Sequence, residues 1–197
     1  MKSKKTIAFI PAVFAVFLFT SCGYNSMVTL REEVESQWAN VETQYQRRAD
    51  LVPNLVASVK AYAKHESEIF TQISQARSDL VSGGNPDSSI TDDPEKLEAY
   101  QKAQDALSSG LSRLIAIAEA YPDLKANQNF LDLQSQLEGT ENRIATERHR
   151  YNEAVKKYNS TIQRFPENLT AKMFHFDSKA YFTAAAGTEV APVVSFD

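Results

Sequence analysis

The chain has 197 residues, and its 25 Asp and Glu side chains outnumber its 21 Lys and Arg side chains, for a net charge of −4 at pH 7. An acidic surface repels a phosphate backbone, so this charge balance argues against a nucleic-acid partner. The single cysteine excludes a disulfide within the chain. Apolar residues repeat at helical spacing over long stretches, without the alternation that marks strands.

The N-terminus carries the pattern of an export signal. Lys2, Lys4 and Lys5 precede a mostly apolar run over residues 7–19, and small residues follow just before Cys22. Such lysines stay in the cytoplasm while the apolar run enters the translocon. The run is shorter than the ~20 residues that a membrane-crossing helix needs. We therefore predict a lipoprotein signal peptide, with an uncleaved anchor and an incidental cysteine as the alternative.

Cleavage before Cys22 would make this cysteine the first residue of the mature chain and the site of lipidation. Two acyl chains on Cys22 are enough for stable anchoring. Removal of three lysines leaves 18 Lys and Arg against 25 Asp and Glu, a net charge of −7. We expect a lipid-anchored membrane protein of the bacterial cell envelope, with its folded part outside the cytoplasm and no free thiol for catalysis.

Two apolar stripes with helical spacing occupy the first third of the mature chain. The first stripe consists of Val34, Trp38, Val41 and Tyr45, and the second extends from Val52 to Leu80. Their registers join without a break, so a single kinked helix over residues 24–81 is one interpretation. Pro53 favours a boundary, because a proline inside a helix costs ~3 kcal/mol. With Asp50 as the N-cap, Pro53 would fall in a first turn, where it is tolerated.

We prefer a chain that folds back near residues 47–50. A straight helix would leave Trp38, Val41 and Tyr45 unburied, and each large side chain left in water forgoes ~1.5–3 kcal/mol. Folding back buries the first stripe as a fourth helix of matching length. The prediction is an all-α protein, an antiparallel up-and-down four-helix bundle whose first helix is broken or kinked near Pro53.

Two further stretches have the apolar spacing of long helices, residues 94–121 and residues 126–164. Asp92 or Asp93 can cap the first of them, and Pro94 suits its first turn. A proline follows each stretch and ends the helix. Both stretches therefore contribute long helices to the predicted bundle.

The remaining segments connect or follow the long helices. The polar composition of residues 82–93 predicts a flexible loop, and a short helix is predicted at residues 167–173. Aromatic side chains that could cover one end of the bundle come next: Phe174, Phe176, Tyr181 and Phe182. Residues 184–197 lack periodicity, which predicts a mobile tail. The predicted organisation is a signal peptide (1–21), a helical bundle (22–165), and a short C-terminal helix with a mobile tail (166–197).

Several blocks of this sequence resemble the signature of the LemA family. They are residues 47–56 with Tyr62 and His65-Glu66, residues 118–127, residues 137–145, the pairs Tyr151-Asn152 and Tyr158-Asn159, and residues 191–196. The match covers nearly all of the mature chain in order. The resemblance implies a membrane-anchored helical bundle of bacteria whose biochemical activity is not established. The short apolar run and Cys22 mark a lipoprotein-type member, unlike relatives with a transmembrane helix.

The sequence lacks the motifs of the common catalytic helical bundles. Di-iron bundles use Glu-x-x-His pairs, because residues three apart project inward together. His65 directly precedes Glu66, and His149 lies two positions after Glu147, so neither pair shares a helix face. His-Glu-x-x-His, glycine-rich phosphate loops and Gly-x-Ser-x-Gly turns are also missing from the sequence. We predict a protein that is not an enzyme and that holds no metal and no cofactor.

Four polar residues, Glu66, Gln104, Thr140 and Glu147, nevertheless occupy positions where the helical pattern calls for apolar side chains. Buried carboxylates need partners, and Arg113, Arg143 or Arg148 could supply them. The four residues could form a layer that fixes the register of the bundle, or a polar cleft that receives a ligand or a partner peptide. This candidate polar layer consists of Glu66, Gln104, Thr140 and Glu147.

A second polar cluster surrounds the predicted hinge and consists of Arg47, Arg48, Asp50 and Asn54. Helix capping and ion pairing explain these residues, and a binding surface is the alternative. The overall hypothesis is a membrane-anchored scaffold that binds another envelope protein. A small-ligand or metal sensor, or a hydrolase accessory protein, that uses the candidate polar layer is the alternative function.

Overall fold

The computed structural model describes residues 3–82 and 88–183, and within them the side chains of residues 23–80 and 88–183. All regular elements in these ranges are helices, which confirms the predicted all-α class. In chain order they are α1 (Ser3–Lys60), α2 (Ser67–Ser82), the 3-10 helix η1 (Ser88–Asp92), α3 (Pro94–Ala118), α4 (Pro122–Lys125), α5 (Gln128–Gln163) and α6 (Glu167–Met173). The predicted mobile tail, residues 83–87 of the predicted loop, and the side chain of Cys22 lie outside the described residues. The rest of the predicted loop is more ordered than its polar composition suggested, because residues 88–92 form η1 and bury Ile90 and Thr91.

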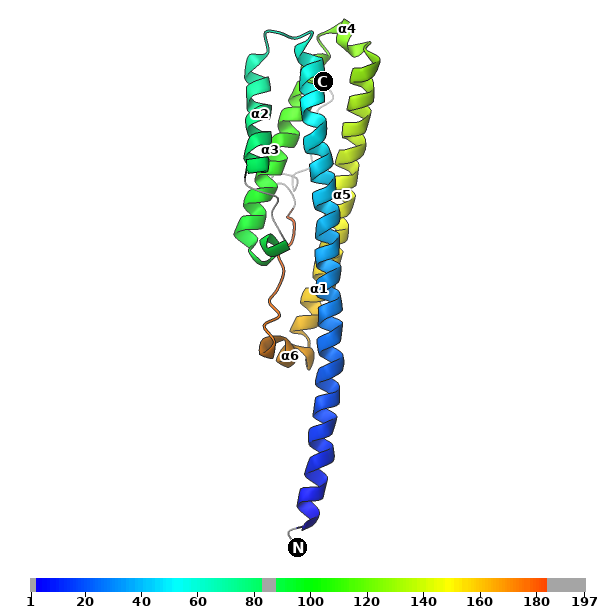
Figure 1. The fold of residues 1–197 in the computed structure, drawn as a ribbon, viewed down its shortest axis with the longest axis vertical. Coiled ribbons are helices and arrows are strands. Elements are labelled where there is room, and N and C mark those ends of the chain that lie inside the picture. The colour runs from blue at the N-terminus through cyan, green and yellow to red at the C-terminus, as the bar shows by residue number, and fades with distance from the viewer. Residues whose placement is uncertain (1–2, 83–87, 184–197) are drawn as a thin grey trace, which may run out of the picture.

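The four longest helices alternate in direction along the chain, but they do not match in length (Figure 1). α1 has 58 residues and α5 has 36, and these two helices lie side by side over most of the length of α5. α2 and α3 have 16 and 25 residues and pack against each other beside the C-terminal part of α1. Toward the N-terminus of α1, α5 is the one long helix of the described residues that stays beside it, and the first part of α1 extends beyond α5 (Figure 1).

The predicted break near Pro53 is wrong, because α1 continues through Pro53 to Lys60. Proline lacks an N–H group, so the carbonyl of Ala49, four residues earlier, has no helical donor. The guanidinium of Arg77 on α2 replaces the missing donor, with its Nε 3.0 Å from the oxygen of Ala49. The chain reverses direction at residues 61–66 instead.

The burial argument for folding back fails because other segments cover the first apolar stripe. Trp38, Val41 and Tyr45 are all buried in the straight helix. The ring of Trp38 stacks on Phe182, with ring centroids 5.9 Å apart, and meets Tyr151 of α5 edge to face at 5.8 Å. α5 and the segment after α6 therefore bury the first apolar stripe, which the folded-back helix was expected to bury.

The predicted helix start at Pro94 is confirmed in its details. The side chain of Asp93 accepts hydrogen bonds from the backbone N–H groups of Glu95 and Lys96, at 3.1 and 3.2 Å. These bonds satisfy two of the N–H groups that a helix start leaves without partners. Asn127 caps α5 in the same way, accepting from the N–H of Phe130 at 3.2 Å.

The buried apolar side chains form two cores, which we name lower and upper after the positions of their helices in Figure 1. The lower core lies between α1, α5, α6, the segment that follows α6, η1 and the first turns of α3, and it includes Val34, Trp38, Tyr45, Leu97, Ile144, Tyr151, Tyr158, Phe176 and Phe182. The upper core lies between α1, α2, α3 and α5, and it includes Val52, Leu55, Val59, Phe70, Ile73, Leu107, Leu111, Leu114, Phe130 and Leu137.

α6 has the bounds that the sequence predicts, and its end turns the chain back along the bundle. The N–H of Phe176 donates to the carbonyl of Ala171 at 2.9 Å, and His175 between them has a φ of 56°. This is the Schellman ending, in which one left-handed residue reverses the chain. Residues 174–183, which we call the strap, then run back alongside α5 (Figure 1).

The two Tyr-Asn pairs of α5 hold the strap by its backbone. Asn159 exchanges two hydrogen bonds with the main chain of Lys179, and Asn152 does the same with Phe182, all at 2.9 Å. The two asparagines lie seven positions apart, about 10.5 Å along a helix. Lys179 and Phe182 lie three positions apart, roughly 10 Å along extended chain. Because the two lengths match, the side-chain amides of Asn152 and Asn159 can pair with the backbone N–H and C=O groups of the strap. A neighbouring strand would otherwise have to supply these hydrogen bonds.

The tyrosines of the same pairs add two more bonds of this kind. The hydroxyl of Tyr151 donates to the carbonyl of Ala180, and the hydroxyl of Tyr158 to the carbonyl of Asp177, both at 2.9 Å. Burial raises the pKa of both hydroxyls, in Tyr158 to about 12, so both groups remain donors at neutral pH. The strap thus covers the lower core without any regular secondary structure of its own.

Candidate functional site

The structure brings together only part of the candidate polar layer. Gln104 of α3 and Thr140 of α5 are buried at the boundary between the two cores. Glu147 lies about two turns further along α5 and is half-buried. Glu66 lies in the turn between α1 and α2, at the end of the bundle, and is half-buried there.

Arg48 lies at the same boundary and binds Gln104. Its side chain is 2% exposed, and its guanidinium donates to both carboxylate oxygens of Glu141, at 2.9 and 3.1 Å. It also donates to the hydroxyl of Ser108 at 3.2 Å and to the backbone and side-chain oxygens of Gln104. One arginine of α1 thereby connects α3 and α5. We call Arg48, Gln104, Ser108 and Glu141 the arginine layer.

A second arginine, which is half-buried, lies on the lower side of the arginine layer. Arg148 donates to the hydroxyl of Tyr45 at 2.6 Å and to the carboxylate of Asp105 at 3.1 Å. Its guanidinium also stacks over the rings of Tyr45 and Phe182, at 5.5 and 5.0 Å. Burial raises the pKa of Tyr45, although the positive charge of Arg148 opposes the rise. Of the three arginines expected as partners for buried carboxylates, Arg148 is the one for which the described residues show an ion pair, and its partner Asp105 is 41% exposed.

The residues of the predicted hinge do not surround a hinge. Arg47, Asp50 and Asn54 are exposed on a continuous helix, and the carboxylate of Asp50 accepts from Gln46 at 2.8 Å. Arg48 differs from them because it continues the apolar register: Tyr45 precedes it by three positions and Val52 follows it by four. That spacing was the signal in the sequence for a buried arginine, once a helix break is not assumed.

The arginine layer is filled by groups of the protein itself. Every terminal nitrogen of the Arg48 guanidinium has a protein acceptor, and its Nε is the one guanidinium nitrogen with no partner among the described residues. Thr140 donates to the carbonyl of Gln136 within its own helix, at 2.8 Å. Across residues 23–80 and 88–183, no three His, Cys, Asp or Glu side chains gather as metal ligands would. The layer is therefore arranged to hold helices together.

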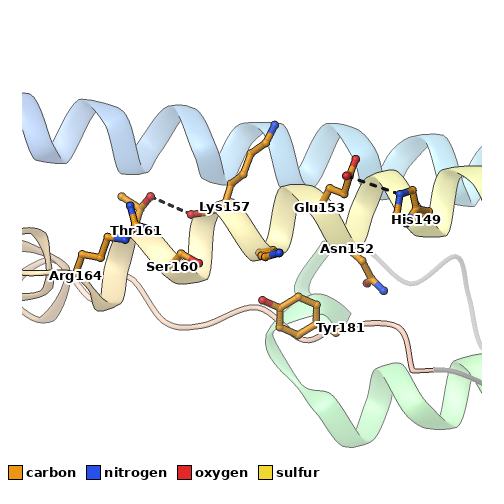
Figure 2. A pocket seen from close by; sticks show the side chains of 9 residues that line it. His149, Asn152, Glu153, Lys157, Ser160, Thr161, Arg164 and Tyr181 are labelled. Atoms are coloured by element: carbon orange, nitrogen blue, oxygen red, sulfur yellow. Dashed lines mark hydrogen bonds and ion pairs between the residues drawn. The ribbon is translucent and has the colours of Figure 1, made fainter.

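A shallow, open groove of about 870 Å³ lies along the outer face of α5, and its far edge is the strap. Figure 2 shows Lys157 and Glu153 on the edge of α5 that faces α1, and Tyr181 of the strap on the opposite edge. Nine residues line it and we call them the α5 groove: His149, Asn152, Glu153, Lys156, Lys157, Ser160, Thr161, Arg164 and Tyr181.

The α5 groove is basic in a chain that is acidic overall. Lys156, Lys157 and Arg164 contribute three positive charges against the one carboxylate of Glu153. Lys157 reaches Glu33 of α1 at 3.5 Å, whereas Lys156 and Arg164 are exposed. Tyr181 is also exposed, because Asn152 and Asn159 bind the strap on either side of it and leave its ring outward. The sequence analysis expected Tyr181 to cover one end of the bundle, but its ring is exposed, and the positive charge of the groove was not singled out.

Comparison with known proteins adds a family to this geometry. The LemA family model matches residues 37–196, which include the arginine layer, the Tyr-Asn pairs and the strap. The chain belongs to the LemA family. The resemblance found in the sequence blocks is thereby confirmed.

Curated relatives of this LemA-family chain include magnetosome proteins. It is 30% identical over 174 residues to magnetosome protein MamQ 1 of Paramagnetospirillum magneticum, an alignment that covers 81% of this chain and 64% of the relative. The MamQ protein of Magnetospirillum gryphiswaldense is 29% identical over the same shares. Protein LemA of Metamycoplasma hominis is 25% identical over 180 residues, 91% of this chain and 78% of the relative. The chain thus spans less than two thirds of the length of its magnetosome relatives.

The described helices were also compared with the requirements of a membrane span. In the part of the chain whose side chains are placed, no helix is both long enough and apolar enough to cross a bilayer.

Proposed function

We propose that this LemA-family protein is a non-enzymatic, membrane-anchored scaffold of the bacterial cell envelope that holds an acidic partner protein against the α5 groove. The observation that carries the proposal is the continuity of α1. One helix extends from Ser3, ahead of the apolar run, to Lys60 at the far end of the bundle. Whatever holds the apolar run or Cys22 at a membrane therefore holds the whole bundle in a fixed relation to it.

The internal contacts of the bundle support a scaffold rather than a receptor for a small ligand. The arginine layer joins three helices at mid-height, and its terminal nitrogens already bind protein oxygens. A ligand would have to displace Glu141 or Gln104 from a buried arginine, which leaves a charge unpaired. The alternative of a ligand sensor built on the polar layer therefore has less support.

The α5 groove is the surface best suited to a partner protein. It presents the exposed charges of Lys156 and Arg164 beside an exposed tyrosine, Tyr181. Arginine and tyrosine are enriched in protein interfaces, and complementary charge speeds association. An acidic surface on the partner would complement the groove, while the acidic remainder of the chain would repel that surface elsewhere.

Site-specific photo-crosslinking in intact cells tests the proposed partner surface. A photoreactive residue at Ser160 in the groove should yield one recurrent adduct, identified by mass spectrometry as an envelope protein with an acidic surface. The matched position is Ser78, which is exposed on α2. Lys156→Glu should abolish the adduct, while Lys64→Glu, an exposed charge outside the groove, should leave it. Equal adducts from Ser160 and Ser78, or an adduct that survives Lys156→Glu, would contradict the proposal.

Cell fractionation and acyl labelling test the proposed anchor separately. The wild-type chain should incorporate labelled fatty acid and sediment with membranes. Cys22→Ser should leave an unprocessed or released form without label. Labelling that is unchanged in Cys22→Ser would refute lipidation at this residue, and a wild-type chain that stays in the soluble fraction would refute the anchor itself.

A further inference from the structure

Exposed apolar side chains gather at one end of the bundle, on α6 and the residues beside it. Phe165, Leu169 and Met173 are 79%, 61% and 60% exposed, and Phe174 and Tyr24 are exposed next to them. Large apolar side chains that cluster in this way, rather than standing singly, indicate a surface that contacts something other than water. We call these five residues the α6 patch.

The helix α6 is oriented so that its apolar side faces away from the protein. The residues of α6 that are buried against α1 and α5 are small, Thr170 and Ala171. Leu169 and Met173, four positions apart, share one face of the helix and lie outside the core. A helix that served only to end the bundle would be expected to place its larger apolar side chains inward.

The α6 patch lies beside the point where the apolar N-terminal run enters the bundle. A Cβ atom built on Gly23 would lie 3.8 Å from Cγ of Glu167, the first residue of α6. The ring of Tyr24 meets Phe174 edge to face, with centroids 4.9 Å apart. In Figure 1, α6 is level with the part of α1 that follows the N-terminal extension. Gly23 directly follows Cys22 in the sequence.

We propose that the α6 patch inserts into the surface of the membrane and forms a second contact with the lipid bilayer. The inference rests on the proposed membrane anchor, but not on its chemistry. An acylated Cys22 and an uncleaved apolar run both place Gly23 at the bilayer surface, and the contact with Glu167 then places α6 there too. Apolar side chains at this level enter the boundary between headgroups and acyl chains.

The charges around the patch fit an anionic lipid surface. Lys172 of α6 and Arg164 just before it are exposed, and basic side chains near the bilayer are attracted to anionic headgroups. A second contact also has a mechanical effect. Acyl chains on one residue leave a rod free to tilt, whereas a second contact on α6 fixes which side of the bundle faces the membrane.

Tryptophan quenching by brominated lipids tests the proposal on the full chain. Trp38 is the only tryptophan of the protein and is buried, so it provides the background signal. Leu169→Trp places a reporter in the α6 patch, and Leu131→Trp places the same reporter at an exposed leucine near the start of α5, at the other end of the bundle. Each chain is reconstituted into vesicles of phosphatidylethanolamine and phosphatidylglycerol, with or without bromine on the acyl chains.

The expected result is that bromine reduces the reporter emission of Leu169→Trp at least about twofold, because an inserted side chain lies within ~5–10 Å of the headgroup boundary. The emission of Leu131→Trp and of the wild-type chain should change little. Phe165→Trp, at the most exposed position of the patch, provides a second reporter and should behave like Leu169→Trp.

Other results would overturn the proposal in distinguishable ways. A chain that floats with the vesicles but shows no quenching in either Leu169→Trp or Phe165→Trp would refute insertion of α6 and leave the proposed anchor unaffected. Reporters shielded from aqueous iodide but not quenched by bromine would show that a second copy or another protein covers the patch. A chain that does not float at all would refute both the anchor and the lipid contact.

Discussion

The lower core and the upper core bury neighbouring lengths of the same helix with different chemistry. The upper core lies among four helices and is filled mainly with leucine, isoleucine and valine. The lower core lies between two long helices and the first turns of α3, and the strap completes it. It is rich in aromatic side chains such as Trp38, Tyr151 and Phe182. The two cores show what a bundle needs where α2 is absent and only the start of α3 is present.

Two requirements follow from replacing a helix by extended chain. Extended chain is thinner than a helix, so wide rings fill the space that helical side chains would occupy. Its backbone groups also have no partners within the segment, and buried backbone groups must be paired. The Tyr-Asn pairs meet this second requirement in the lower core, whereas the helices around the upper core satisfy their backbone groups internally, apart from the carbonyl of Ala49 that accepts from Arg77.

The largest expected effect comes from separating the two cores at the arginine layer. Arg48→Met should lower the free energy of unfolding by ~3–5 kcal/mol, because it leaves two buried oxygens of Gln104 without a donor and the partly exposed carboxylate of Glu141 without its partner. Urea unfolding of the full chain in mild detergent measures the change. The matched control is Arg47→Met, an exposed arginine on the same helix, which should change stability by less than ~0.5 kcal/mol. Equal effects of the two substitutions would show that the layer does not join the cores.

A smaller effect is expected from releasing the strap. Asn159→Ala leaves the buried N–H and C=O groups of Lys179 without partners and should cost ~2–4 kcal/mol. Hydrogen exchange at the amide of Lys179 should accelerate, while exchange in the upper core stays slow. Asn142→Ala, an exposed asparagine of α5, provides the control. Uniform acceleration in both cores would mean that the strap is not a separate unit of stability.

Pro53 and Arg77 allow a test of the backbone hydrogen bond to Ala49, beside the upper core. Arg77→Met should cost ~1–3 kcal/mol, because the carbonyl of Ala49 then has no donor. Pro53→Ala restores the helical donor and should stabilise the chain by ~1–3 kcal/mol. In the Pro53→Ala background, Arg77→Met should cost ~1 kcal/mol less than in the wild type. A double-mutant cycle of unfolding free energies measures this coupling, and strict additivity would contradict the replacement of one donor by the other.

The smallest expected effect is a dependence of the lower core on alkaline pH. Burial raises the pKa of Tyr100 to about 12, above the value of ~10 in an unfolded chain. The folded state therefore keeps a proton that the unfolded state loses, so stability present below pH ~10 declines between pH ~10 and ~12. Tyr100→Phe should make this decline shallower by up to ~1.4 kcal/mol per pH unit. Unfolding measured from pH 7 to pH 11 tests it, and an unchanged slope would refute it.

Local features of the fold were accessible from the sequence, and distant ones were not. The cap at Asp93 and the bounds of α6 depend on neighbouring residues, and both predictions agree with the structure. The continuation of α1 through Pro53 depends on Arg77, which lies on another helix. Proline propensity alone therefore predicted a break that tertiary contact removes.

The candidate site followed the same division. Gln104 and Thr140 were found because they interrupt an apolar register on helices with correct boundaries. Arg48 was assigned to a hinge because the helix around it was expected to end. The roles of Asn152 and Asn159 depend on a strap without periodicity, so their spacing carried no signal until the strap was placed beside them.

The hydrogen bonds that hold the strap are made to its main-chain N–H and C=O groups. Every amino acid other than proline supplies both of these groups. Substitution at outward positions such as Ser178 and Tyr181 therefore leaves docking intact while changing what the surface displays. Evolution can thus alter the specificity of this face residue by residue without repacking the interior. For the same reason, the face is a practical place to graft new recognition chemistry onto the bundle.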